Sequence, residues 1–357
     1  MSFLKKILII FFFLMPISNA FAEFTFVQTK NVALDTPGIR GINFKPDGTR
    51  MYITNRYDDQ KAYLIEYSLS KPFDISTATI SFTGGAPKGT ALACDDAGDD
   101  DHMELPHAIE FKPDGTRMFV TTNKDFGSGK PGVAVFQFKL TTPWDSTTLV
   151  CEKIYEVAVN GSGAKEDNVR TLDFNPDGTR MFVGGSRRDK IRQYDLATPF
   201  DLRSGVTPGG ISDALDSFED DMRDIQFNPD GTQMFLTGSE RNSGLMQKFT
   251  LSTPYDITTL SSTTETFSLI SPSDSNLVNN LRGFIFAVNF TKIFVTSDDG
   301  DDDDAGNDNQ IHEFDIDCAG TITCADPSAN ADVKAIIEAN VESAKRIIRN
   351  NTLPIFH

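Results

Sequence analysis

Five basic side chains stand at equivalent positions along this 357-residue chain. Each lies four residues before a phenylalanine that ends a short apolar segment, and the set is Arg40, His107, Arg170, Arg223 and Arg282. Arginine binds carboxylates, phosphates and hydroxyl-rich ligands through paired hydrogen bonds. The set therefore predicts one of two arrangements: a site for an anionic or hydroxyl-rich ligand, or ion pairs with carboxylates such as Asp167 and Asp221 that join neighbouring structural units.

Acidic residues gather in four runs, at 95–101, 166–167, 219–221 and 298–304. The last run favours a Ca²⁺ site with Asp299, Asp301 and Asp303 as ligands, because calcium takes several oxygen ligands from flexible loops. It does not match an EF-hand loop, since position 12 counted from Asp301 is His312 and not glutamate. The alternative is a solvated acidic loop, for which a charge run alone is sufficient.

The five basic residues lie at the same place in each copy of a repeated sequence motif, so the fold of the repeat must position them. The marker phenylalanines, about 53 to 67 residues apart, are Phe44, Phe111, Phe174, Phe227 and Phe286. The first four are followed at once by Lys-Pro-Asp-Gly-Thr or Asn-Pro-Asp-Gly-Thr and a second apolar strand. Each interval has room for about four strands, so the repeat predicts an all-β fold, a five-bladed β-propeller.

A second phrase recurs where the third strand of a unit ends. It contains proline, an aromatic residue and aspartate, and it spans 69–77, 140–148, 196–204 and 251–259. Proline and aspartate stop the strand and start a turn, and we expect the aromatic residue to cover the outer edge of the blade.

The two ends of the repeat region complete one another. Residues 24–32 alternate like a strand that lacks its own blade, whereas the fifth unit has three strands, the last near 311–316. Pairing these segments would close the ring and remove exposed strand edges. In such a ring the acidic runs and the five basic residues lie on one face, and the Pro-Asp-Gly turns lie on the other.

Residues 38–316 resemble bacterial propellers of the WD40-like, TolB-like and lactonase-like kind. The resemblance rests on the phrase Phe-x-Pro-Asp-Gly-Thr, which joins the two innermost strands of a blade in those proteins. It implies the fold and leaves the function open, because lactonases, periplasmic scaffolds and surface binding proteins all use such blades.

The N-terminal segment and the cysteines predict export. Residues 1–22 have the pattern of a signal peptide cleaved before Glu23, which leaves a propeller at 23–326 in an extracellular, cell-surface or periplasmic location. Disulfides are expected between Cys318 and Cys324, and between Cys94 and Cys151 within a single blade.

Residues 327–357 differ in character. Apolar residues recur at three- and four-residue steps over 331–350, which predicts an amphipathic helix. This tail resembles the linker that precedes the outer-membrane barrel of autotransporter-like surface proteins. No alternating barrel strands follow in this sequence, so we expect outer-membrane association only if a barrel belongs to the full-length product.

The formal net charge of −18 argues against a nucleic-acid partner, because phosphate binding requires a cationic surface. The histidines stand in no catalytic triad motif. The leading hypothesis is a non-catalytic, secreted or surface-displayed propeller. It would bind a polysaccharide, a protein or a small anionic ligand through an acidic face with a central ring of arginines. The alternative is a hydrolase of the lactonase or glycosidase type at the channel mouth with a Ca²⁺ site, which would require Glu, Asn and Asp around one cation.

Overall fold

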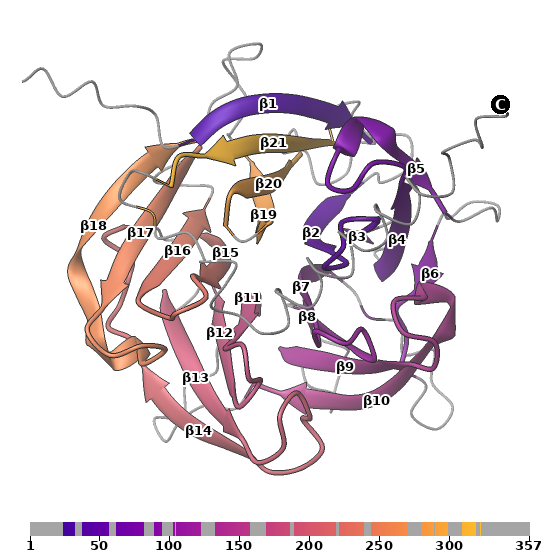
Figure 1. Cartoon of the computed structure of the whole chain (residues 1–357). Coiled ribbons are helices and arrows are strands. Elements are labelled where there is room, and N and C mark those ends of the chain that lie inside the picture. The colour runs from indigo at the N-terminus through magenta and orange to yellow at the C-terminus, as the bar shows by residue number, and fades with distance from the viewer. Residues whose placement is uncertain are drawn as a thin grey trace, which may run out of the picture.

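A computed structural model shows five antiparallel sheets arranged around a central axis, which confirms the five-bladed β-propeller (Figure 1). The structure describes residues 24–32, 38–56, 62–81, 89–94, 103, 105–122, 133–157, 169–185, 189–218, 221–238, 244–269, 280–288, 290–298, 309–318 and 322. Among these residues no helix is long and apolar enough to cross a membrane. The helix predicted over 331–350 lies outside them.

The strands follow the chain from the axis outward in each blade. Blade 1 contains β2 (Ile39–Phe44), β3 (Arg50–Arg56), β4 (Ala62–Leu69) and β5 (Ala78–Ile80), and β6 (Thr90–Ala91) also pairs with β4. Blade 2 contains β7 (Pro106–Phe111), β8 (Arg117–Thr122), β9 (Ala134–Leu140) and β10 (Leu149–Glu156). Blade 3 contains β11 (Val169–Phe174), β12 (Arg180–Gly185), β13 (Lys190–Leu196) and β14 (Val206–Ile211). Blade 4 contains β15 (Met222–Phe227), β16 (Gln233–Gly238), β17 (Leu245–Leu251) and β18 (Leu260–Ser268).

The fifth blade closes the ring. It contains β19 (Leu281–Ala287), β20 (Lys292–Ser297) and β21 (Gln310–Ile316), and its outermost strand is β1 (Phe24–Asn31) from the N-terminal end. The register runs antiparallel from Phe24 opposite Ile316 to Asn31 opposite Gln310. Figure 1 shows the indigo β1 lying along the yellow β21 at the rim. The predicted closure is confirmed.

The repeated aromatic residues pack between blades. Each marker phenylalanine contacts the aromatic residue of the second strand in the preceding blade, with ring centroids 4.4 to 4.8 Å apart. The pairs are Phe44 with Phe294, Tyr52 with Phe111, Phe119 with Phe174, Phe182 with Phe227 and Phe235 with Phe286. Such pairs contribute about 0.5 to 1.5 kcal/mol beyond their buried area. The first and last residues of the repeated motif, the marker phenylalanine and the aromatic residue of the second strand, therefore hold neighbouring sheets together.

The aromatic residue of the second phrase does not cover the outer blade edge as expected. Its ring lies on the glycine of the Pro-Asp-Gly turn in the same blade: a Cβ placed on Gly48 would come within 2.2 Å of the Phe73 ring. The same ring contacts the marker Phe44, with centroids 5.6 Å apart. Gly48 has φ of +69°, so this position favours glycine both for its backbone and for the close approach of the ring. The sequence did not predict this contact, because Gly48 and Phe73 belong to two different turns that lie 25 residues apart.

The arginine that follows each of the first three Pro-Asp-Gly-Thr turns binds the next blade. Arg50, Arg117 and Arg180 donate to the backbone carbonyl oxygens of Trp144, Phe200 and Tyr255, at 2.7 to 3.1 Å. Each acceptor is the aromatic residue of the second phrase in the following blade. In the fourth copy Gln233 replaces arginine, and no such phrase follows β21 in the fifth blade. The substitution therefore occurs where the acceptor is missing.

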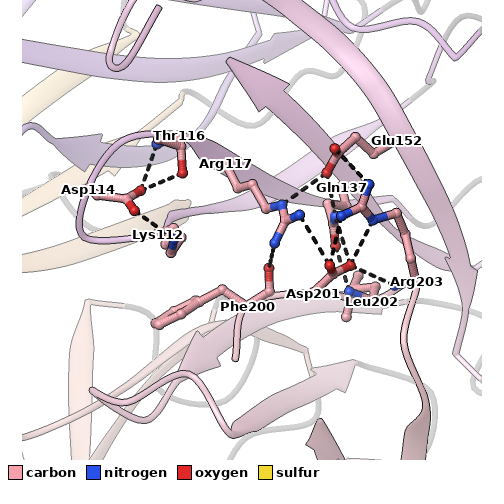
Figure 2. A network of polar contacts seen from close by, with 10 residues as sticks. All are labelled: Lys112, Asp114, Thr116, Arg117, Gln137, Glu152, Phe200, Asp201, Leu202 and Arg203. Carbon is pink, nitrogen blue, oxygen red and sulfur yellow. Dashed lines mark hydrogen bonds and ion pairs between the residues drawn. The ribbon is translucent and has the colours of Figure 1, made fainter. Parts of the chain in front are cut away.

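The densest of these contacts joins blades 2 and 3 (Figure 2). Arg117 pairs with Glu152 at 3.0 Å and Asp201 at 3.1 Å, and Arg203 pairs with the same two carboxylates. Gln137 donates to Glu152 and accepts from the backbone N–H of Leu202. The two carboxylate side chains are 11% and 9% exposed, so they depend on these partners in place of water.

Replacing Arg117 by methionine is expected to lower the free energy of unfolding by about 2 kcal/mol, because Glu152 and Asp201 would each lose one of their two arginine partners. Arg180→Met is the matched control, since Arg180 and its partner Asp195 are 38% and 53% exposed and an exposed pair contributes well under about 1 kcal/mol. Urea unfolding of both variants measures the difference. Equal losses would contradict the role assigned to the buried carboxylates.

The disulfide between Cys94 and Cys151 is present, with the two Cα atoms 5.1 Å apart. It joins two blades and does not lie within one as expected, because Cys94 follows β6, which pairs with blade 1, whereas Cys151 is on β10 of blade 2. Cys318 is also disulfide-bonded. Its predicted partner Cys324 lies outside the described residues.

Candidate ligand-binding site at the basic ring

The five predicted basic residues all lie on the innermost strands, and we call Arg40, His107, Arg170, Arg223 and Arg282 the basic ring. In every one of these strands the pairing register shifts by one residue at this position. In β11, for example, Val169 pairs with Gly185 and Thr171 with Gly184, which leaves Arg170 as the extra residue of a β-bulge. A bulge redirects the side chain of the extra residue. Five bulges thus aim five basic side chains at one place.

Threonines of the second strands fix the backbone of the ring. The hydroxyls of Thr54, Thr121 and Thr296 donate to the carbonyl oxygens of His107, Arg170 and Arg40, at 2.5 to 3.1 Å. Each bond crosses from one blade to the next. Three of the five bulges are therefore held by the neighbouring sheet, so these ring positions depend on the assembled propeller and not on a single blade.

Two carboxylates each join two ring arginines from neighbouring blades. Asp221 pairs with Arg170 through one oxygen and with Arg223 at 2.6 Å through the other. Asp298 pairs with Arg40 and Arg282, both at 2.7 Å. The predicted ion pairs between blades are confirmed for Asp221, whereas Asp167 lies outside the described residues. Asp298 begins the fourth acidic run, and the structure places its carboxylate between Arg40 and Arg282 of the basic ring.

Within the described residues, His107 is the ring member without a carboxylate partner. Its side chain is buried, with 3% exposure, and neither ring nitrogen has a hydrogen-bond partner in the described part of the chain. Burial lowers the pKa of His107 well below its ordinary value, and the positive charges of Arg170, Arg40, Arg223 and Arg282 lower it further. All four arginines act on this imidazole, which shows that the ring converges. At neutral pH the imidazole carries no charge.

Four guanidinium groups face two carboxylates, Asp221 and Asp298, among the residues that the structure describes. The pKa of Arg223 is lowered to about 9, first by burial and then by repulsion from Arg170 and Arg282, against the attraction of Asp221. A bound anion would reduce this repulsion. The arrangement is chemically suited to hold a small negatively charged ligand.

Further along the same strands, polar side chains bind backbone groups of the next blade. Asp173 accepts from Phe227 N at 2.6 Å, Asp224 from Phe284 N at 3.1 Å and Gln226 from Phe286 N at 2.7 Å. Asn43 donates to the Ile109 carbonyl at 3.1 Å. Sequence reasoning missed these residues, although the position directly before the marker phenylalanine is polar in four of the five blades, as Asn43, Glu110, Asp173 and Gln226.

Two of these polar residues, Asp173 and Asp224, are buried carboxyl groups, and Glu110 of blade 2 is a half-buried one. We call Glu110, Asp173 and Asp224 the carboxyl layer. Burial raises the pKa of Asp173 to about 7. Burial also raises the pKa values of Glu110 and Asp224 well above their usual range, and repulsion from Asp173 adds to both. The hydrolase hypothesis expected Glu, Asn and Asp around one cation. In the structure, both carboxylate oxygens of Asp173 and of Asp224 instead accept hydrogen bonds from backbone N–H groups.

The predicted calcium ligands Asp299, Asp301 and Asp303 lie outside the described residues. Within the described ranges no group of three or more His, Cys, Asp or Glu side chains is arranged to hold a metal ion. The calcium site stays a prediction.

A second buried histidine ties the closing strand to its blade. His312 lies between the hydroxyls of Thr29 on β1 at 2.8 Å and Ser297 on β20 at 2.9 Å. Ser297 and His312 are both buried, with 6% and 2% exposure. This row of side chains across β20, β21 and β1 supports ring closure.

No protein-family model matches the chain, and no curated protein sequence matches it either. Several solved structures show a distant likeness. A putative 6-phosphogluconolactonase from Bacteroides fragilis is 14% identical, with 79% of this chain and 81% of that chain covered and a TM-score of 0.44. Regucalcin from Agrobacterium tumefaciens, a calcium-binding protein, is 14% identical, with 82% and 96% covered and a TM-score of 0.44. A luciferin-regenerating enzyme is 11% identical, with 81% and 95% covered and a TM-score of 0.43. At these identities and scores, none of the three informs the ligand or the chemistry of the basic ring.

Proposed function

We propose that this protein is an exported, non-catalytic β-propeller that binds a small anion at the basic ring. The observation that carries the proposal is that, in the part of the chain that the structure describes, four buried arginines surround the carboxylates of Asp221 and Asp298 and a buried imidazole whose two nitrogens have no hydrogen-bond partner there. Export is supported by the signal-peptide pattern of residues 1–22 and by the Cys94–Cys151 disulfide, since structural disulfides are typical of oxidising compartments.

A small anion fits the basic ring better than the other ligand classes considered, polysaccharide and protein. The side chains of the four ring arginines are only 3% to 13% exposed. A macromolecular surface cannot reach groups that are this deeply placed, so the proposal is limited to a ligand of a few atoms. The net charge of −18 would also repel a polyanion over the range of a Debye length.

The proposal predicts that carboxylates or phosphate bind the mature protein and that the affinity depends on Arg223. Titration calorimetry with butyrate, succinate, phosphate and sulfate would measure binding. Arg223→Gln is expected to weaken it roughly 10- to 100-fold, the value of one charge-assisted hydrogen-bonded pair. Arg180→Gln, a substitution at an exposed arginine on β12 outside the ring, is the control and should bind like the parent protein.

Because Arg223→Gln also removes a partner of Asp221, Arg223→Lys provides a second test that keeps the charge and changes the geometry. It should retain intermediate affinity. If none of the four anions binds the parent protein at millimolar concentration, or if Arg223→Gln binds as tightly as the parent, the anion-binding function is wrong.

A further inference from the structure

We infer that the disulfide of Cys318 replaces, in blade 5, a side-chain hydrogen bond that closes the corresponding turn in other blades, and that it makes the end of the ring sensitive to reducing agents. This goes beyond the proposed ligand binding and does not depend on it. Three observations support it: the spacing of the residues after β21, the packing of Ile322 and the different exposure of the cysteines.

The chain after β21 keeps the spacing of the second phrase without its proline, aromatic residue and aspartate. The N–H of Ile316 donates to the Thr291 carbonyl at 2.9 Å, as the N–H of Leu69 donates to the Thr49 carbonyl at 2.8 Å. Ile316 therefore corresponds to Leu69, the first residue of the phrase. The residues six positions further on are Ile75, Ser146, Leu202 and Ile257 in blades 1 to 4, and Ile322 in blade 5.

Ile322 also corresponds to these residues in its packing. The four residues of blades 1 to 4 are at most 3% exposed, and Ile322 is 1% exposed. Ile257 belongs to the apolar cluster between blades 3 and 4. Ile322 belongs to the cluster between blades 4 and 5, which includes Phe235 and Phe314. Ile322 therefore supplies the apolar residue of the missing phrase.

The aromatic residue of the missing phrase comes from another part of blade 5. Phe290 lies between β19 and β20, with its ring centroid 4.0 Å from that of the marker Phe286 and 5.9 Å from that of Phe235 in blade 4. Tyr255, the aromatic residue of the phrase in blade 4, lies 5.6 Å from its own marker and 6.3 Å from Phe182 in blade 3. Phe290 and Tyr255 have similar positive φ, +67° and +55°. The segment after β21 thus has no aromatic anchor of its own.

In three other blades a threonine hydroxyl closes the turn of the second phrase. The hydroxyl accepts from the backbone N–H of the residue six positions earlier, at 3.1 to 3.2 Å. The donors and acceptors are Lys71 with Thr77, Thr142 with Thr148, and Thr253 with Thr259. Counted from Ile316, the same two positions in blade 5 are Cys318 and Cys324.

The pairing of the cysteines agrees with this correspondence. Cys318 is disulfide-bonded, and Cys94 is bonded to Cys151. Cys324, outside the described residues, is the cysteine of the sequence that remains. A covalent bond thus takes the place of the threonine hydrogen bond in the blade whose segment lacks the aromatic anchor.

The two disulfides differ in their access to solvent. Cys94 is 3% exposed and lies in an apolar cluster, whereas Cys318 is exposed. Thiol–disulfide exchange requires access of the attacking thiolate, and exposed disulfides are the more easily reduced ones. A dithiol therefore reduces the Cys318 bond first: the two sulfurs of the dithiol form a disulfide, and its two hydrogens pass to the two cysteine thiols.

Reduction is expected to loosen the closing blade. Phe24, the first residue of β1, pairs with Ile316 and belongs to the same apolar cluster as Ile322. When Ile322 is no longer fixed by the disulfide, this end of β1 and of β21 loses part of its packing. Local opening of this kind accelerates the exchange of amide hydrogens in the affected strands without unfolding the protein.

Hydrogen exchange of the mature protein, followed by mass spectrometry, tests the inference. Dithiothreitol is used at a concentration at which alkylated peptides show the Cys94–Cys151 bond intact, and the peptide map of the oxidised protein should join Cys318 to Cys324. Reduction should accelerate exchange at 24–26 and 314–318 by roughly 10-fold or more. Exchange at 134–148 of blade 2, where Thr148 closes the turn, should not change.

Three variants separate the bond from the packing. Cys318→Thr with Cys324→Thr gives blade 5 the threonine pair of blade 2, and it should exchange at a rate between those of the oxidised and reduced parent, with no response to dithiothreitol. Cys318→Ala with Cys324→Ala should exchange like the reduced parent. Ile322→Ala should exchange faster than the parent at the same residues while its disulfide is intact.

Several results contradict the inference. One is a peptide map in which Cys318 is joined to a cysteine other than Cys324, and another is reduction of the Cys94–Cys151 bond first. Equal exchange at 24–26 and 314–318 before and after reduction shows that the disulfide does not hold this end of the ring. Faster exchange in all five blades shows that the bond acts on global stability and not on the closing blade.

Discussion

A variant in which Cys94 and Cys151 are both replaced by valine is expected to lose about 4 kcal/mol of unfolding free energy. The two residues are separated by 57 positions, and in the chain-entropy model a cross-link over a loop of this length removes about that much freedom from the unfolded state. For a protein of this size the loss corresponds to a fall of roughly 5 to 10 °C in the melting temperature. Urea unfolding and thermal melts measure it.

The place of the bond in the fold adds to its effect. Cys94 lies in the segment that connects blades 1 and 2, which is held to blade 1 by the Leu92 N–H bond to the Ala62 carbonyl at 2.9 Å. Cys151 lies on β10 of blade 2. The disulfide therefore also links two sheets that otherwise meet through side chains such as Tyr52 and Phe111.

Valine is preferred to serine in this test, because Cys94 is 3% exposed within an apolar cluster and a buried hydroxyl would add a cost of its own. Chemical reduction is less suitable, because Cys318 is also disulfide-bonded. A double variant within about 1 kcal/mol of the parent would show that the unfolded chain gains little freedom when the bond is absent.

The blades were predictable because the turns that separate their strands are stabilised by local hydrogen bonds. In Asp47-Gly48-Thr49, the Asp47 carboxylate accepts from the Thr49 backbone N–H at 3.0 Å and from its hydroxyl at 2.6 Å, and Gly48 adopts positive φ. Every one of these bonds lies within three residues. A single sequence therefore reveals the turn, the two strands that it joins and, by repetition, the number of blades.

Contacts between repeats were not predictable in the same way. The Phe73 ring lies on Gly48, and Arg50 reaches the Trp144 carbonyl of the next blade. Each of these contacts joins two motifs that look independent along the chain. We expected the aromatic residues at the outer blade edge, and this prediction was wrong. A repeated motif identifies which residues recur, but it does not identify which other motif they contact.

The basic ring was predictable as a set of residues, and its bulges were missed. Regular alternation inward from Ile42 would place an apolar residue at position 40, where arginine stands, and the next apolar residue is Ile39. The same break of parity precedes the other marker phenylalanines, for example at Arg170 after Val169. A strand in which apolar and polar positions exchange parity at a constant place indicates a bulge, and this pattern was present in the sequence.

The carboxyl layer gives the propeller an unusual dependence on pH. The folded-state pKa of Asp173 is raised to about 7 from an ordinary value of 3.8. A raised pKa means that the stability contribution of this group is fully present below pH 4 and is lost as the pH rises through 7. At 1.36 kcal/mol per pKa unit the loss is about 4 kcal/mol. Glu110 and Asp224 are shifted in the same direction.

The ring histidine acts in the opposite sense. The pKa of His107 is lowered in the folded state, so below pH 6.5 the unfolded chain takes up a proton that the folded chain refuses, and stability falls. Carboxylates whose pKa values are lowered by hydrogen bonds and nearby positive charges, such as Asp201 beside Arg203, lose their contribution only below about pH 4. A pH profile of the parent protein alone would mix these effects.

Comparison of the parent with Asp173→Asn isolates the carboxyl layer, because His107 is present in both. At pH 3.5, below the unfolded-state pKa, the variant should be less stable by about 1 kcal/mol, since an amide offers one acceptor oxygen where Asp173 accepts from two backbone N–H groups. At pH 8.5 it should be more stable by up to about 3 kcal/mol, because the buried charge is absent. Urea unfolding at the two pH values measures this change of sign. A difference between parent and variant that is the same at both pH values would show that the pKa of Asp173 is not raised in the folded protein, and the carboxyl layer would then be held by its backbone hydrogen bonds alone.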